Sequence, residues 1–266
     1  MNTSFSGRYG PWALVTGASK GLGAEFCRQL AAAGMSLVMV ASHEETLRAQ
    51  SAAIERQYGV NTRPIALDLG GSSFISRLAP LTADLDITLL ISNAAVSNVG
   101  PFLKATPEYL ARQVYVNSLA GVLLARHYGA LMVRRGRGGI VLMSSGSAQH
   151  GTPYTANYAA TKAFNRILAE SLWYEFKPSG VDVLAVLAGA TRTEGWLANE
   201  PKPDWLVPVM GVKPVVGAAL RALGKRPSVA PGLINRLGYA ALSLMTRGRA
   251  VKTLGASMNK MFGPYE

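Results

Sequence analysis

Cysteine and histidine are scarce in this chain of 266 residues, which has one Cys and three His. Cys27 cannot form an internal disulfide, and no metal-ligand spacing surrounds it. His43, His127 and His150 are scattered along the sequence. The chain therefore predicts no metal site and favours a reducing compartment.

Long apolar runs are also absent. No stretch approaches the roughly 20 apolar residues that cross a bilayer, and residues 1–11 are polar, without the apolar core of a signal peptide. The best apolar patch, residues 237–245, contains Gly238 and lies between Arg236 and Arg247. We expect a cytoplasmic protein, either soluble or peripheral at a membrane surface.

Acidic residues are nearly missing from the C-terminal part. The whole chain has 27 Lys and Arg against 15 Asp and Glu, a net charge of +12. From residue 205 onward nine basic residues stand against Glu266 alone. A basic tail of this kind fits phosphate, anionic lipid or an acidic partner chain. No nucleic-acid motif accompanies it, so no nucleic-acid partner is expected.

Apolar runs alternate with helical patterns through most of the chain, whose composition is that of a globular protein. The expected strands are 12–16, 36–41, 62–67, 87–91, 140–144 and 181–187; the expected helices run through Phe26 and Leu30 and over 44–58, 72–83, 107–134 and 157–176. This alternation predicts one α/β domain over 1–266, doubly wound around a parallel sheet with helices on both faces.

The first strand runs into a glycine-rich turn, Gly17-Ala-Ser-Lys-Gly21-Leu-Gly23, and then a helix. Such a turn lets the backbone approach a pyrophosphate at a helix N-terminus. The alternative is a plain strand-to-helix connection, because the spacing differs from the commoner dinucleotide fingerprint. Other polar or small residues follow the later strands. Because the carboxyl ends of parallel strands lie at one edge of the sheet, we expect these residues near the glycine-rich turn, where ligands bind in such folds.

Tyr158 precedes Lys162 by four residues in an expected helix, so the phenol and the ammonium share one face. A free tyrosine has a pKa of roughly 10, and a nearby ammonium lowers it. Ser145, at a strand end, offers a hydroxyl for a carbonyl oxygen. Alone, such a pair is more often a half-buried aromatic beside a solvated lysine; the strand-edge context favours acid–base chemistry.

These motifs together resemble the short-chain dehydrogenase/reductase family, from about Tyr9 to Thr193: Thr16-Gly-x-x-x-Gly-x-Gly23, Asn93-Ala-Ala95, Asn117, Ser145 and Tyr158-x-x-x-Lys162. The resemblance implies a seven-stranded Rossmann sheet. It also implies a catalytic tetrad of Asn117, Ser145, Tyr158 and Lys162, in which Asn117 keeps a bend in its helix and a proton-passing water. Ser144 is the alternative to Ser145, and the thirteen-residue gap to Tyr158 favours Ser145.

The branch most similar to this chain contains hydroxysteroid dehydrogenases and long-chain 3-oxoacyl-CoA reductases. The resemblance assigns cofactor binding to Gly17, Ser19, Lys20, Gly21, Leu22, Gly23, Ser42, His43, Asp68, Leu69, Asn93, Ala94, Ala95, Tyr158, Lys162, Gly189, Thr191 and Thr193. Two positions depart from the family pattern: Ala95 replaces a glycine, and Ala188 replaces the proline that usually precedes Gly189.

The implied function is an oxidoreductase interconverting a ketone and a secondary alcohol. NADP(H) is expected over NAD(H), because Ala41-Ser42-His43 lacks the acidic residue of NAD enzymes and Lys20 is available for a 2′-phosphate. The usual Arg near position 42 is missing, so NAD(H) remains open. The alternative is a dinucleotide-binding sensor or scaffold without turnover. An intact tetrad argues against it.

Residues 191–209 are expected to form a substrate lid, whose bulky side chains predict a lipophilic substrate: Trp196, Leu197, Trp205 and Leu206. Residues 233–266 are expected to form a basic helical extension. One interpretation packs it on the core or on a second subunit of a homodimer or homotetramer. The other rests it on an anionic membrane.

Overall fold

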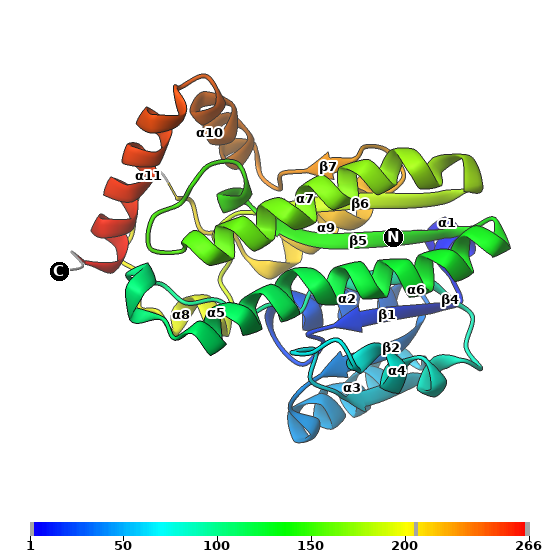
Figure 1. The fold of residues 1–266 in the computed structure, drawn as a ribbon. Helices are drawn as coiled ribbons and strands as arrows, with labels where there is room; N and C mark the ends of the chain where they lie inside the picture. The colour runs from blue at the N-terminus through cyan, green and yellow to red at the C-terminus, as the bar shows by residue number, and fades with distance from the viewer. Residues whose placement is uncertain (1–2, 205–206, 264–266) are drawn as a thin grey trace.

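The computed structural model describes residues 3–204 and 207–263. Seven parallel strands form one sheet in the order β3-β2-β1-β4-β5-β6-β7 (Figure 1). Their bounds are β1 Trp12–Thr16, β2 Ser36–Ala41, β3 Thr62–Ala66, β4 Ile87–Ser92, β5 Gly138–Ser145, β6 Val181–Ala188 and β7 Ser228–Val229. The predicted doubly wound seven-stranded sheet is confirmed.

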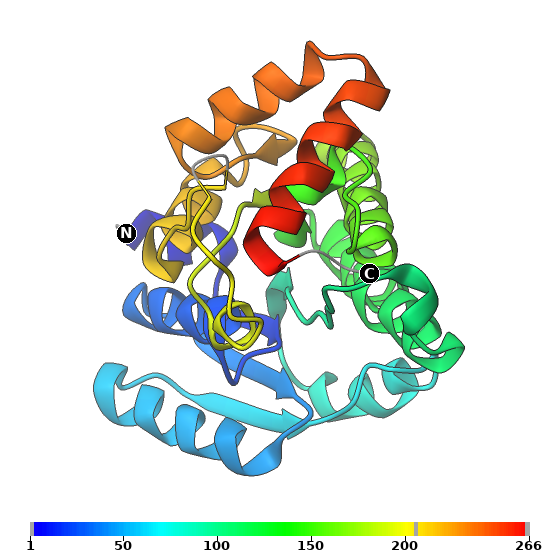
Figure 2. The same ribbon diagram turned by 90° about the vertical axis from the view of Figure 1, so that its left-hand side faces the viewer.

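Helices cover both faces of the sheet (Figures 1 and 2). One face packs against α1 Thr3–Tyr9, α2 Gly21–Ala32, α3 Glu44–Tyr58 and α9 Val212–Ala222. The other packs against α4 Phe74–Leu78, α6 Ala120–Arg135 and α7 Ala156–Phe176. The remaining helices are α5 Pro107–Val114, α8 Glu194–Leu197, α10 Leu233–Ser243 and α11 Arg247–Phe262.

The central strands are apolar along their length because both of their faces are buried. Successive side chains point to opposite faces, so Leu14 packs with one helical layer while Ala13 and Val15 pack with the other. All three are fully buried. Each central strand therefore contributes side chains to a hydrophobic core on both faces of the sheet, and these two cores hold the strand ends in place.

In several places the structure departs from the predicted elements or adds to them. Over 72–83 there is only a five-residue helix, α4, because Pro80 follows it and opens a short 3-10 turn. The helix predicted over 107–134 is interrupted by a π-helical segment, Tyr115–Leu119. Strand β7 has two residues, too few for a sequence signal. In the lid region only α8 is helical; Trp205 and Leu206 lie outside the described residues.

Helices α10 and α11 lie beside the carboxyl ends of the strands (Figures 1 and 2). Helix α11 buries Ala250, Met258 and Met261, and its Ser257 hydroxyl donates to Asp204 Oδ2 at 2.6 Å. Helix α10 exposes most of its surface. Among the described residues, none of the helices has the length and apolar character required to cross a bilayer.

Candidate active site

The glycine-rich turn between β1 and α2 has the backbone geometry of a phosphate cradle. Gly17 and Gly21 adopt φ values of +65° and +54°, which favour glycine. At Gly23 a Cβ atom would lie 2.7 Å from Asn93 Nδ2 and would overlap the Gly17 carbonyl. No side chain caps the α2 N-terminus, so its first N–H groups are open to an anion. These residues therefore fit a dinucleotide pyrophosphate.

Asn93 fastens the end of β4 to the end of β1. Its Nδ2 donates to the Thr16 carbonyl at 2.9 Å. The Thr16 hydroxyl in turn accepts the backbone N–H groups of Asn93 and Ala94, at 2.9 and 3.0 Å. Ala95, which replaces the family glycine, is exposed, so its methyl group displaces no protein atom. The ends of β1 and β4 beside the glycine-rich turn are therefore joined in one hydrogen-bonded unit.

Tyr158 and Ser145 are brought together at the end of β5. The Ser145 hydroxyl hydrogen-bonds the phenol, and it also accepts from the Ser147 backbone N–H at 3.2 Å. Burial raises the pKa of Tyr158 above the ordinary tyrosine value, and the Ser145 hydrogen bond offsets part of that rise. The phenol is therefore protonated at neutral pH and can act as an acid.

Lys162 is buried, with 3% of its surface exposed. Its Nζ donates to the Met143 carbonyl at 3.2 Å and lies 5.5 Å from the centre of the Tyr158 ring. Burial lowers the pKa of Lys162 to about 8, because desolvation penalises the ammonium. The predicted lowering of the Tyr158 pKa by Lys162 is wrong for this structure: burial raises that pKa, and the group that partly offsets the rise is Ser145, not Lys162.

Asn117 lies inside the π-helical segment and hydrogen-bonds with the loop that follows β4. Its Oδ1 accepts the Val96 N–H at 2.8 Å, and its Nδ2 donates to the Val96 carbonyl at 2.9 Å. Nδ2 also lies 3.2 Å from Thr161 Oγ1. The amide group is therefore occupied by structural bonds, and the role of Asn117 in holding a water remains a prediction.

Asn165 completes this buried network, and we did not predict it. Its Nδ2 donates to the Asn117 carbonyl at 2.7 Å and to the Met143 carbonyl at 3.2 Å. The Met143 carbonyl also accepts the hydrogen bond from Lys162 Nζ. The helical spacing was a usable signal, because Asn165 follows Lys162 by three residues on one face of α7.

Three other predicted cofactor positions, Asp68, Ser42 and His43, hydrogen-bond with protein side chains. Both Asp68 carboxylate oxygens accept hydrogen bonds from the Arg112 guanidinium, at 2.9 and 3.0 Å. This pairing is the main cause of a lowered Asp68 pKa. At the end of β2, Ser42 Oγ lies 3.1 Å from His43 Nδ1, and both residues are exposed. Leu69 is buried in the core. Arg112 was missed because 44 residues separate it from Asp68.

The segment predicted to form a lid meets the glycine-rich turn through Thr193 and Glu194. A Cβ at Gly21 would lie 3.2 Å from Thr193 Cγ2. The Thr193 hydroxyl caps α8 by accepting from the Trp196 N–H at 3.2 Å. Lys20, predicted to face a phosphate, is ion-paired with Glu194 at 3.0 Å. Ser19 and Leu22 lie in the same turn and helix start.

Beyond β6, the chain turns back through Gly189 and Thr191. The Thr191 hydroxyl donates to the Gly189 carbonyl at 2.9 Å, and Thr191 forms a single bridge with Met210. A Cβ at Gly189 would lie 2.7 Å from Asn235 Nδ2 of α10. The buried Ala188 occupies the place of the family proline. Helix α10 therefore contacts the residue that follows β6 directly.

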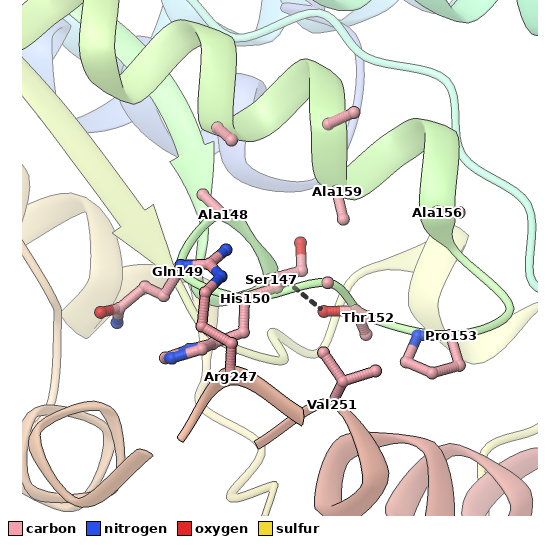
Figure 3. Close-up of a pocket in the computed structure, with 13 residues that line it drawn as sticks. Ser147, Ala148, Gln149, His150, Thr152, Pro153, Ala156, Ala159, Arg247 and Val251 are labelled. Atoms are coloured by element: carbon pink, nitrogen blue, oxygen red, sulfur yellow. Dashed lines mark hydrogen bonds between the residues drawn. The ribbon is translucent and has the colours of Figure 1, made fainter. Parts of the chain in front are cut away.

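An apolar cavity of about 380 Å³ adjoins the loop that follows Ser145 (Figure 3). Small side chains of α7 and the first turns of α11 line it: Ala156, Ala159, Ala160, Ala163 and Val251. Ser147 Oγ and His150 Nδ1 are buried there without a partner among the described residues. Burial, and then Arg247, lower the His150 pKa. The cavity thus borders the loop that follows Ser145 on the α11 side.

The solved structures that this fold resembles include a 7beta-hydroxysteroid dehydrogenase, at a TM-score of 0.89 and 27% identity over 96% of this chain and 99% of that chain. A short-chain dehydrogenase from Sphingobium yanoikuyae in complex with NADPH has a TM-score of 0.78 and 32% identity, over 88% and 92% of the two chains.

Two curated relatives illustrate the sequence similarity. A 7beta-hydroxysteroid dehydrogenase of Clostridium sardiniense is 29% identical over 97% of this chain and 99% of its own length. A very-long-chain 3-oxoacyl-CoA reductase of Podospora anserina is 34% identical over 82% of this chain, which covers 64% of that protein. The short chain dehydrogenase family model matches residues 11–203. The chain belongs to the short-chain dehydrogenase family of oxidoreductases, which act on CH–OH and C=O groups.

Proposed function

We propose that this chain is an NADP(H)-dependent oxidoreductase that interconverts a ketone and a secondary alcohol on a lipophilic substrate. The observation that carries the proposal is that the Ser145 side chain lies beside the Tyr158 phenol, with buried Lys162 one helical turn away. A dinucleotide-binding sensor has no need of these three groups in one place. The arrangement therefore favours turnover over the sensor or scaffold alternative.

The protein's own groups manage the proton. In reduction, Tyr158 donates its hydroxyl proton to the substrate oxygen, and in oxidation it accepts that proton back. Ser145 donates a hydrogen bond to the same oxygen and holds it against the phenol. Lys162 contributes positive charge beneath the phenol and a donor for a ribose hydroxyl. When bound, the dinucleotide supplies or accepts the hydride.

The preference for NADP(H) rests on charge. No acidic side chain occupies residues 41–43 at the end of β2, and Lys20 Nζ stands in the glycine-rich turn. The related Sphingobium enzyme was solved with NADPH. The ion pair of Lys20 with Glu194 is largely exposed, so a 2′-phosphate competes with that carboxylate at small cost.

A lipophilic substrate is supported by the surfaces near the site. Small apolar side chains of α7, with Pro153 and Val251, line much of the cavity beside the loop that follows Ser145. Leu197 of the lid is exposed, and Trp196 stacks edge-on against Phe262 of α11, with ring centres 5.9 Å apart. The relatives named above are described as acting on hydroxysteroids and on acyl-CoA, and we assign this chain to substrates of similar character.

Two exposed surfaces bear on assembly in a cytoplasmic setting. Helix α7 exposes Phe164, Ile167 and Tyr174, which supports a homodimer or homotetramer. Helix α10 exposes Leu233, Ile234 and Leu237 beside the basic residues of α11, a pattern that favours contact with an anionic membrane surface. Packing of α10 on a second subunit is the alternative.

Absorbance at the NADPH band, followed with small, steroidal and acyl ketones, tests the proposed function. We expect NADPH oxidation with at least one bulky ketone and a smaller kcat/KM with NADH. Tight NADPH binding without turnover of any of these ketones would instead establish the sensor.

A further inference from the structure

Helix α10 directs two polar side chains inward, Asn235 and Tyr239. They are four residues apart and therefore share one face of the helix. Asn235 is 5% exposed and donates to the Pro231 carbonyl at 2.9 Å, while Tyr239 packs partly buried against the core. The opposite face of α10 is exposed and apolar. The two inward residues are thus the part of α10 that meets the body of the protein.

Each inward residue rests on a glycine at the end of a central strand. Asn235 lies against Gly189, directly after β6, and Tyr239 lies against Gly146, directly after β5. A Cβ at Gly146 would lie 2.8 Å from Tyr239 Cε1 and would overlap the phenol oxygen. Gly146 follows Ser145 in the chain. The Tyr239 hydroxyl therefore lies where the side chain of any residue other than glycine at position 146 would stand, next to Ser145.

Tyr239 also lies within electrostatic reach of Tyr158. Burial, and then the proximity of Tyr158, raise the pKa of Tyr239 to about 12. The phenol is therefore protonated throughout the physiological range and is an available O–H donor. No hydrogen-bond partner for this hydroxyl occurs within the described part of the chain.

We propose that Tyr239 is a substrate-binding residue, whose phenol donates a hydrogen bond to the substrate next to its reacting carbonyl, from the side of Gly146. The inference rests on the proposed carbonyl reductase function and adds the C-terminal helix to the site. Helix α10 then helps to determine which substrate binds. The Tyr239 ring bounds the space beside Ser145, and its O–H favours substrates that carry a hydrogen-bond acceptor at that position.

The variant Tyr239→Phe keeps the ring and removes only the hydroxyl. A net hydrogen bond of about 0.5–1.5 kcal/mol corresponds to about a two- to twelvefold effect, so we expect kcat/KM for the best ketone to fall within that range. The dissociation constant of NADPH should stay within twofold. Tyr128→Phe is the matched control, because its buried hydroxyl pairs with Thr82 far from the site, at 2.8 Å.

A second measurement separates this inference from the proposed function. Calorimetric titration of ketone into the NADPH complex of Tyr158→Phe, with and without Tyr239→Phe, measures binding without turnover. Weaker ketone binding when Tyr239→Phe is added supports the inference. Unchanged kcat/KM and unchanged ketone affinity overturn it while leaving the proposed function intact, and a wild-type chain that neither binds nor reduces any ketone overturns both.

Discussion

Lys20 Nζ and Glu194 Oε2 are 3.0 Å apart, and this ion pair joins the glycine-rich turn to the first residue of helix α8. Both side chains are more than half exposed, at 58% and 67%. Exposed pairs of this kind contribute about 0–1 kcal/mol. The pair is therefore weak enough to open when a cofactor phosphate competes for the lysine.

Substitution Glu194→Gln should strengthen NADPH binding about two- to fivefold and leave NADH binding unchanged, because it frees Lys20 for the 2′-phosphate. Lys20→Ala should weaken NADPH binding and narrow the difference between the cofactors. Fluorescence titration measures both, with Glu108→Gln on exposed α5 as the control. Equal kcat/KM for NADPH and NADH, unaffected by Lys20→Ala, would contradict the NADP(H) assignment.

The buried Lys162 should make stability depend on pH in a defined direction. Its pKa is about 8 in the folded protein and 10.5 ordinarily. Between these values the unfolded chain binds a proton that the folded chain has released, so the free energy of unfolding rises with pH. The rise is at most about 1.4 kcal/mol per pH unit. Below pH 8 the full cost of the buried charge is present.

Lys162→Met removes that ionisation. We expect the variant to be more stable than the wild type at pH 7, with a difference that shrinks from pH 8 to 10. Urea unfolding at several pH values measures it, and other titrating groups cancel in the comparison. A difference independent of pH would show that Lys162 keeps an ordinary pKa.

Asn165→Ala should destabilise the protein by about 1–3 kcal/mol, because the carbonyls of Asn117 and Met143 lose a buried donor. The urea midpoint measures the loss, with Asn199→Ala on the exposed lid as the control. An Asn165→Ala midpoint equal to that of wild type would show that the network adds no stability.

The surface of α10 predicts salt-sensitive binding to anionic vesicles. The attraction between anionic lipid headgroups and the basic side chains of α11 weakens with salt, because the Debye length shrinks from about 10 Å at 0.1 M to about 3 Å at 1 M. Co-sedimentation of the full chain should fall when Ile234 and Leu237 are changed to Ser, but not for Leu103→Ser, which is exposed elsewhere. Absence of binding at low salt would leave α10 to subunit packing.

Local patterns in the sequence predicted much of this molecule, and contacts across long separations account for the rest. The strand ends and the Tyr158–Lys162 spacing follow from periodicities of a few residues. Tyr239 was missed because 81 positions separate it from Tyr158, and only the return of α10 to the sheet edge brings them close. The Lys20 ion pair and the Asp68–Arg112 pair were missed for the same reason.

The acid–base role of Tyr158 is the central claim, and the kcat of Tyr158→Phe tests it most directly. The ring packs identically while the exchangeable proton is lost, and a general acid contributes about 10²- to 10⁴-fold. Tyr174→Phe, exposed on the same helix α7, is the control, and Lys162→Ala should impair both turnover and cofactor binding. We predict a kcat for Tyr158→Phe at least a hundredfold below wild type, with NADPH affinity within a few fold; a variant that keeps a tenth or more of wild-type kcat would contradict the account.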